Sequence, residues 1–324
     1  MTSVTDRHNG LELGRVIAVV AVIMIHLPDP NWYVINFAVP YFFVLSGYLL
    51  SRRAHAGNYD FRILQKFAIR HWKLFAFWAL LYSVIPPNWP YYVTRGGWAV
   101  GFLNTLEASF AKFLINPANF LLDGPPYGFH LWYLASAPLA AGIVFMLARR
   151  KMQMISVVLA LVCIGTLMLL KPEQRLGTDY WASNAKLGLL NAIPCICFGW
   201  FYALQREANY HLLIGSFLLS IGLVISSLDN SFILTPITGV VLGIGLFVVL
   251  IAFPAMPLDG LWSELGRMTL GVYLIHIALR PIVFFAMPKI LWAPSWVGVV
   301  FLTLLSFLAV FFISKLPVIK KYVS

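Results

Sequence analysis

The chain has 324 residues, of which 60% are hydrophobic and only 11% are charged, and its mean hydropathy is +0.83. A soluble domain carries about 25% charged residues, so this composition excludes an ordinary soluble globular protein. The net charge of +11 does not indicate nucleic-acid binding, because the cations lie between apolar runs rather than on one basic face. The composition therefore predicts an integral membrane protein.

Apolar segments long enough to cross a bilayer follow one another along the chain. A crossing helix needs about 20 mostly apolar residues, with a range of ~17–25. Ten such segments lie at 11–27, 34–51, 67–86, 131–148, 152–170, 186–204, 211–228, 236–254, 267–285 and 296–316. No small-residue cleavage site follows the first one, so it is predicted to be a membrane helix rather than a removable signal. The sequence predicts a single all-α, polytopic membrane domain over residues 1–324.

The distribution of Lys and Arg orients these segments. With both termini in the cytoplasm, sixteen Lys and Arg lie on the cytoplasmic side and seven lie outside, as the positive-inside rule expects. Residues 98–121 place apolar side chains at helical spacing, with Asn104, Glu107 and Lys112 between them. This pattern predicts an amphipathic helix that is interfacial or re-entrant. If residues 98–121 crossed the membrane fully, the basic residues 149–151 would lie on the outer side, against the positive-inside rule.

The first apolar segment carries Arg15 near its start and His26 near its end. A charge at membrane depth costs roughly 2.5–3.5 kcal/mol or more, which makes such residues functional candidates. On a helix the two side chains share one face, roughly 16 Å apart along the axis. Glu12, three residues before Arg15, can pair with it. One helix face thus joins an anion-binding group to a titratable group, unless Arg15 only reaches the inner headgroups and His26 only marks the outer interface.

Other polar residues lie at the edges of the predicted spans. His130 precedes the fourth span and His276 lies in the ninth; each is either a proton-transfer group or a hydrogen-bonded core histidine. Arg70 and Lys73 lie three residues apart in the third span, a spacing that suits a phosphate-bearing ligand, although positive-inside topology also accounts for them. The three cysteines lie in apolar segments without metal-ligand spacing, so no metal site is predicted.

Four motifs, in order along the chain, resemble the acyltransferase 3 family of bacterial membrane O-acyltransferases. They are Glu12-Leu13-Gly14-Arg15 through His26, Phe42-Phe43-Val44-Leu45-Ser46-Gly47-Tyr48, His130-Leu131-Trp132-Tyr133-Leu134, and the stretch from Leu265 to His276. Glu12 stands where that family usually has Asp. Lys73 stands where the family often has a second Arg, which keeps the charge but loses the bidentate fork. The resemblance covers most of the chain.

The resemblance implies transfer of an acyl group, usually acetyl, from cytoplasmic acetyl-CoA or another acyl-CoA. The acceptor would be a hydroxyl of a cell-surface or lipid-linked glycan, and the enzyme would lie in the bacterial inner membrane. Arg15, Arg70 and Lys73 are expected to bind the donor phosphates. His26 is expected to act as general base, and no metal is expected to take part.

The resemblance also implies that Glu12, Ser46, His130, Trp132 and His276 bind or orient substrate. Direct transfer at His26 is the main expectation, and prior acylation of Ser46 or of His26 itself is the alternative. A transporter or flippase for a glycolipid or an anionic metabolite is a competing class, and a structural or signalling subunit is a third. The acceptor glycan and the oligomeric state stay open at this point.

Overall fold

The computed structural model describes residues 8–27, 36–169, 184–205, 210–228, 235–253, 259–286 and 295–316, and within them it shows helices, turns and loops but no strand. The long helices are α1 (Asn9–Ile25), α2 (Ala38–Ala56), α3 (Phe61–Tyr82), α7 (Trp132–Arg149), α8 (Gln153–Leu169), α10 (Asn184–Tyr202), α11 (His211–Leu228), α12 (Thr235–Ile251), α13 (Asp259–Ala286) and α14 (Ser295–Ile313). Each coincides with a predicted apolar segment. The all-α prediction is confirmed.

Two helices extend well beyond the apolar segments that predicted them. α3 begins at Phe61 rather than at residue 67, because the carboxylate of Asp60 caps the helix by accepting a hydrogen bond from the Arg62 amide. α13 begins at Asp259 rather than at 267. Hydropathy detects only the apolar part of a helix, so polar helical ends of this kind escape it.

Four helical stretches of the described residues are long and apolar enough to cross a membrane, namely Trp132–Arg149, His211–Leu228, Gly260–Phe285 and Trp296–Ile313. Shorter apolar stretches lie in α8, α10 and α12. The charged residues of the predicted site lie in α1 and α3, two helices that are not among these stretches. Residues 1–7 and 317–324 lie outside the described residues, so the cytoplasmic placement of both termini stays a prediction.

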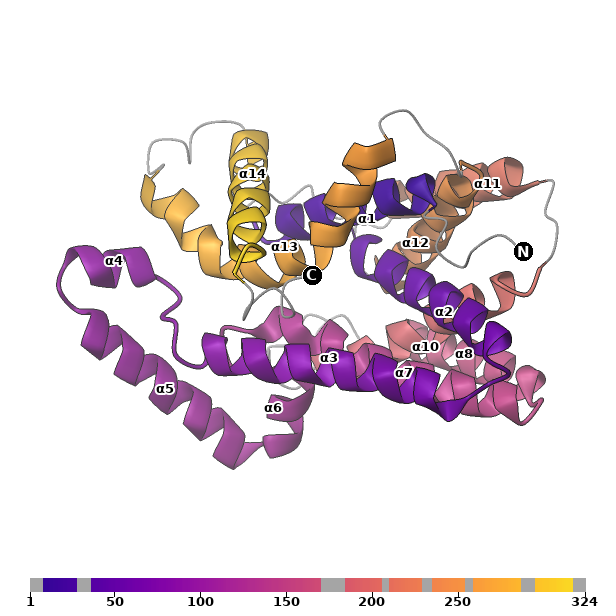
Figure 1. Ribbon diagram of the computed structural model, residues 1–324, viewed down its shortest axis with the longest axis horizontal. Helices are drawn as coiled ribbons and strands as arrows, with labels where there is room; N and C mark the ends of the chain where they lie inside the picture. The colour runs from indigo at the N-terminus through magenta and orange to yellow at the C-terminus, as the bar shows by residue number, and fades with distance from the viewer. Residues whose placement is uncertain are drawn as a thin grey trace.

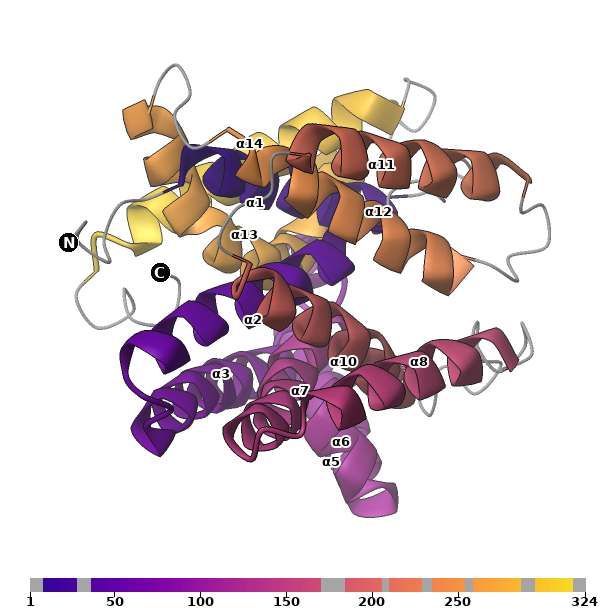
Figure 2. The same ribbon diagram turned by 90° about the vertical axis from the view of Figure 1, so that its right-hand side faces the viewer.

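The helices form two groups with α2 and α10 between them. Figure 2 shows α1, α11, α12, α13 and α14 on one side and α3, α7 and α8 on the other. α11 packs mainly against α12 at the edge of the bundle, and only 11% of its apolar window is buried. A helix so exposed and so apolar is suited to contact with lipid.

α2 and α10 approach so closely that glycines are required on both helices. A Cβ atom added to Gly47 would lie 2.3 Å from the Ile196 carbonyl oxygen, and one added to Gly199 would lie 2.0 Å from the Val44 carbonyl oxygen. Small residues let membrane helices pack backbone against backbone. This contact holds the motif that contains Ser46 against the centre of the bundle.

α1 and α13 point the same way. Glu12, near the start of α1, packs against Gly266 in the first half of α13, and the His26 ring at the far end of α1 lies 5.1 Å from the His276 ring. The predicted topology requires this direction. Each crossing reverses the direction of the chain, and the odd number of seven predicted crossings between α1 and α13 leaves the two helices parallel. An eighth crossing by the 98–121 segment would reverse α13, which favours an interfacial or re-entrant position for that segment.

That segment folds as α5 (Trp98–Ile115) and α6 (Pro117–Asp123), which follow the short helix α4 (Trp89–Thr94). Figure 1 shows α5 extending away from the other helices, whereas α6 returns toward α7. The buried face of α5 carries Gly101, Thr105 and Ser109, whereas its exposed face is apolar and includes Phe110 and Leu114. An amphipathic helix with its apolar face outward fits contact with lipid, although its membrane depth stays a prediction.

The close contact of α2 and α10 yields a stability prediction. Gly47→Ala inserts a methyl group against the α10 backbone and should lower the free energy of unfolding by about 1–3 kcal/mol. Gly142→Ala on α7 is the matched control, because a Cβ there meets nothing within 4 Å. Thermal unfolding in detergent compares the two variants, and equal midpoints would contradict the packing argument.

Candidate active site

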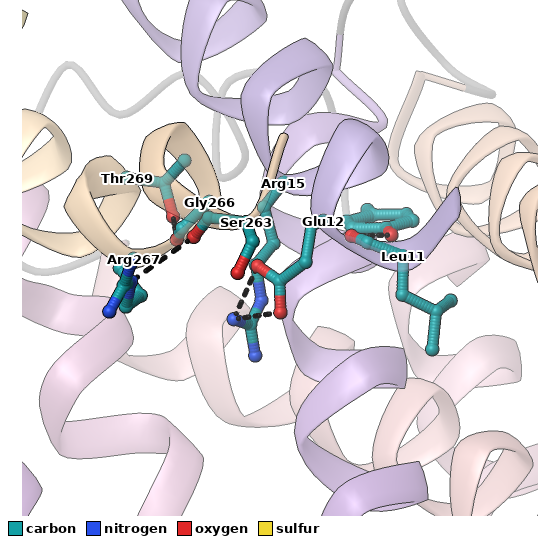
Figure 3. A network of polar contacts seen from close by, with 8 residues as sticks. Leu11, Glu12, Arg15, Ser263, Gly266, Arg267 and Thr269 are labelled. Atoms are coloured by element: carbon teal, nitrogen blue, oxygen red, sulfur yellow. Dashed lines mark hydrogen bonds and ion pairs between the residues drawn. The ribbon is translucent and has the colours of Figure 1, made fainter. Parts of the chain in front are cut away.

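The two ends of the site are called inner and outer after the predicted topology, and the inner end is an ion pair on α1. Nη1 of Arg15 donates to both carboxylate oxygens of Glu12, at 3.0 and 2.9 Å. Glu12 is 9% exposed, and it packs against Gly266 of α13, where a Cβ would lie 2.0 Å from its Oε2 atom. Figure 3 shows the pair between the two helices. The predicted pairing of Glu12 with Arg15 is present in the structure, and α13 forms its second wall.

The helix that carries this pair is held by Tyr41 of α2. The Tyr41 hydroxyl donates to the Leu11 carbonyl at 2.9 Å, in space that exists because Gly14 has no side chain; a Cβ there would lie 2.0 Å from that hydroxyl. The glycine of the first motif therefore has a packing role. It lets a buried tyrosine fix α1 beside α2.

Further cations lie near Arg15. Arg70 of α3 is close enough to Arg15 and Arg53 for their charges to act on it, and Arg70 is itself exposed. Lys73 is also exposed and lies one turn farther along α3. Like charges repel, so such a group is stabilised by a bound anion. The predicted donor-binding residues thus gather at one end of α1, except that no described contact joins Lys73 to Arg15.

His8, at the N-cap of α1, belongs to the same end of the molecule. Burial lowers the pKa of His8 below its ordinary value; a hydrogen bond with the Ile251 backbone opposes this shift, and the charge of Arg52 adds to it. A histidine with a lowered pKa is neutral at neutral pH. The positive charge at this end therefore comes from the arginines and lysine.

The outer end of the site is a group of three histidines from three elements. His26 follows the last residue of α1, His130 lies in the 3₁₀ helix η2 (Phe129–Leu131), and His276 lies in α13. The His276 ring is 5.1 Å from the ring of His26 and 5.4 Å from the ring of His130. His130 and His276 are buried, at 2% and 0% exposure. The structure thus joins three histidines that the sequence singled out separately.

Hydrogen bonding defines the tautomer of His276. Its Nδ1 donates to the Tyr273 carbonyl oxygen at 2.7 Å, since a carbonyl can only accept. In the neutral ring, Nε2 is then the basic nitrogen, and this atom is buried without a hydrogen-bond partner. A buried imidazole nitrogen with an available lone pair is suited to accept a proton or to bind a hydroxyl.

Aromatic residues connect the two ends. Tyr133 of α7 lies near enough to Arg15 and Arg70 to interact with their charges, and its ring is 5.7 Å from the ring of Tyr273. The Tyr273 hydroxyl in turn donates to the His130 carbonyl oxygen. A continuous set of side chains therefore runs from the cations to the histidines. Tyr133 and Tyr273 were not singled out from the sequence, although both lie inside the quoted motifs.

Ser46 and Trp132 occupy different surroundings. The Ser46 hydroxyl lies 3.1 Å from the Tyr133 hydroxyl, so it belongs to the middle of the connecting set. The Trp132 ring lies 5.9 Å from the Phe43 ring and faces Gly188 of α10. Trp132 therefore packs between helices, and no described contact brings it to the histidines. Its predicted role in substrate binding has no support from its position.

Side chains from other elements contact the α13 backbone where it passes the histidines. The Tyr82 hydroxyl donates to the Leu274 carbonyl at 2.7 Å and accepts from the Ala278 amide at 3.2 Å, so it lies between two groups that an α-helix normally pairs. His130 Nε2 donates to the same Leu274 carbonyl at 3.4 Å. Pro281 interrupts the helix further on, and Figure 1 shows α13 changing direction along its length. Inserted side chains and prolines are the usual causes of such bends.

Among the described residues, no group of three or more His, Cys, Asp or Glu side chains is arranged to hold a metal ion. The apolar helices and the polar residues along α1 define a helical membrane protein with cations near one end of α1 and three histidines near the other. A family model described as an acyltransferase domain matches residues 8–315. The chain belongs to the acyltransferase 3 family, and it is a membrane acyltransferase. Comparison with curated proteins and with solved structures finds no match for this chain.

The inserted hydroxyl of Tyr82 gives a testable prediction. Tyr82→Phe removes a buried group that acts as both donor and acceptor, and should lower the free energy of unfolding by about 1–3 kcal/mol. Tyr91→Phe is the control, because Tyr91 is 48% exposed and surface changes usually stay within ~0.5 kcal/mol. Unfolding in detergent is the measurement. A Tyr82→Phe protein as stable as the control would argue against the role given to this hydroxyl.

Proposed function

We propose that this acyltransferase moves an acetyl group from cytoplasmic acetyl-CoA to a hydroxyl of a cell-surface or lipid-linked glycan, across the inner membrane of a bacterium. The observation that carries the proposal is the placement of Arg15 and His26. Arg15 lies among cations at one end of α1, His26 lies among histidines at the other end, and α13 contacts both ends. Such a site is suited to bind a polyanion at one end and to transfer protons at the other.

The donor would be bound through its phosphates. Arg15 uses Nη1 for Glu12, which leaves its other N–H groups to donate to an anion. Arg70 lies near it, Lys73 follows one turn along α3, and both are exposed. Guanidinium and ammonium groups form charge-assisted hydrogen bonds with phosphates. Arg15 and His26 are roughly 16 Å apart along the helix axis. The pantetheine arm of CoA is long and thin enough to carry the thioester across such a distance.

The reaction is a direct transfer in this proposal. His26 accepts the proton of the acceptor hydroxyl while the oxygen attacks the thioester carbonyl carbon. The carbon–sulfur bond then breaks, and the thiolate takes the proton back from His26. The products are an ester and free CoA, so the step needs no further reactant. General-base catalysis of this kind contributes roughly 10²–10⁴-fold to the rate.

His276 and His130 would position the reacting groups. The His276 ring lies next to that of His26, and its Nδ1 is held by a backbone carbonyl. His130 is fixed by its contacts with the Tyr82 ring at 5.0 Å and with the Leu274 carbonyl. Groups held in this way keep one orientation, which favours proton transfer at His26.

An acyl-enzyme relay is the alternative course of the reaction. Ser46 and His26 are its candidate nucleophiles, but Ser46 shares its hydroxyl hydrogen bond with Tyr133 rather than with a histidine. A serine without an adjacent base is a weak nucleophile, so direct transfer is preferred. Incubation of the protein with radiolabelled acetyl-CoA and no acceptor distinguishes direct transfer from the relay, because only the relay leaves label on the protein.

The main test compares alanine variants of the two ends of α1. His26→Ala should lower glycan acetylation roughly 10²–10⁴-fold, since the general base is lost. Arg15→Ala should raise the KM for acetyl-CoA. Acetylation is measured in membranes that contain equal amounts of the protein. Arg150→Ala is the control, because Arg150 is exposed and lies at the end of α7; full activity in both test variants would disprove the proposal.

The Arg15→Lys variant distinguishes a role of Arg15 in donor binding from a role in proton transfer. Lys keeps the positive charge but loses the planar fork that pairs with both Glu12 and a phosphate. The KM for acetyl-CoA should rise, whereas the pH dependence of kcat should stay unchanged because the base is His26. A series of rates against pH at saturating acetyl-CoA provides the measurement. A displaced pH profile would assign Arg15 to proton transfer instead of donor binding.

A further inference from the structure

A cavity of about 220 Å³ lies beside the bend of α13. Its walls come from the end of α3, the loop that follows α3, the loop before η2 and the outer part of α13, and they include Tyr82, Tyr127, Asn88, Ile277, Arg280 and Phe284. The proposed function uses none of these side chains directly. Ligand pockets for drug-sized molecules occupy about 300–1,000 Å³, so this cavity has room for a single sugar ring rather than for an oligosaccharide.

The cavity lies next to the histidines. Tyr82 lines it, and the Tyr82 ring is 5.0 Å from the ring of His130. Ile277, another wall residue, directly follows His276. Arg280 lies four residues after His276, which is about 6 Å farther along a helix, and its charge acts on both His26 and His276. A ligand in the cavity would therefore lie beside Tyr82, which contacts His130, and beside the residue that follows His276.

The chemistry of the wall is suited to a sugar that carries a negative charge. Among the described residues that line the cavity, Arg280 is the only charged one. Its guanidinium lies 5.0 Å from the centre of the Phe284 ring, within the range of a cation–π contact. Tyr127 and Phe284 offer apolar faces for the C–H groups of a sugar ring, and Asn88 offers an amide. An arginine in such surroundings pairs with a carboxylate through two parallel hydrogen bonds.

We propose that this cavity is the subsite for an acidic sugar residue of the acceptor, whose carboxylate pairs with Arg280 while a hydroxyl of the acceptor reaches the histidines. The inference rests on the proposed glycan acyl transfer and adds the acceptor class, a glycan that contains a uronic acid. Tyr82, which hydrogen-bonds to the α13 backbone at Leu274 and Ala278, lines the same cavity as Arg280.

The experiment measures binding rather than turnover. The full chain is placed in nanodiscs of neutral phosphatidylcholine and titrated with methyl β-D-glucuronide and with methyl β-D-glucoside, which differ in the carboxylate. The glucuronide should bind about ten- to one-hundred-fold more tightly, as a charged hydrogen-bonded pair provides. Arg280→Gln should abolish this preference, and Arg280→Lys should keep part of it.

Arg95→Gln is the matched control. Arg95 also lies over an aromatic ring, 4.7 Å from the centre of Tyr91, but it is exposed and does not line the cavity. This variant should keep the preference for the glucuronide. Acetyl-CoA binding, measured on the same samples, should be unchanged in the Arg280 variants, which shows that they are folded.

The two proposals fail in different ways. Equal affinity for the two glycosides, no binding of either, or a preference that survives Arg280→Gln would overturn the acidic-sugar subsite. A wild-type protein that prefers the glucuronide but never releases CoA in the presence of membrane glycans would leave the subsite in place and overturn glycan acyl transfer. If Arg280 acted only through the histidines, its loss would change the rate with either sugar equally and leave the binding preference intact.

Discussion

The site depends on one contact, the packing of α1 against α13. Gly266 has no side chain, so the Glu12 carboxylate can lie against the α13 backbone and still pair with Arg15. A buried charge is costly unless it is paired, and a membrane makes the cost greater because water is absent. The same pair of helices then brings His26 to His276 at the other end. A change in this packing would disturb both ends of the site together.

The histidine end of the site depends on contacts from other elements to the α13 backbone. The Tyr82 hydroxyl hydrogen-bonds to the Leu274 carbonyl and the Ala278 amide, and His130 also reaches that carbonyl. Side-chain hydrogen bonds to a helix backbone are common where membrane helices bend, as α13 does near Pro281. Through these contacts α3 and η2 hold a histidine and a cavity beside the proposed reaction site.

Much of the site was predictable because its residues belong to short motifs with physical meaning. Arg15 and His26 were identified by their presence at membrane depth, and the pairing of Glu12 with Arg15 followed from their spacing on a helix. The gathering of His26, His130 and His276 was not predictable, since the three lie on separate elements far apart in the chain. Trp132 was chosen only for its place in a motif, and the structure places it between helices. No sequence pattern singled out Tyr82 or Arg280. Tyr82 lies in an apolar segment, and Arg280 is a charged residue near the end of a predicted helix.

The amino-acid sequence alone predicts the class of molecule, the helical segments and a candidate site along α1. Composition and local spacing suffice for these, because the apolar length of a helix and its 3.6-residue repeat are properties of one segment. Which helices meet, where α13 bends and which residues surround the cavity are visible only in the folded structure. Those features arise from contacts between segments whose partners no local pattern specifies, such as glycines that admit a neighbouring backbone and a tyrosine hydroxyl that hydrogen-bonds to the backbone of another helix.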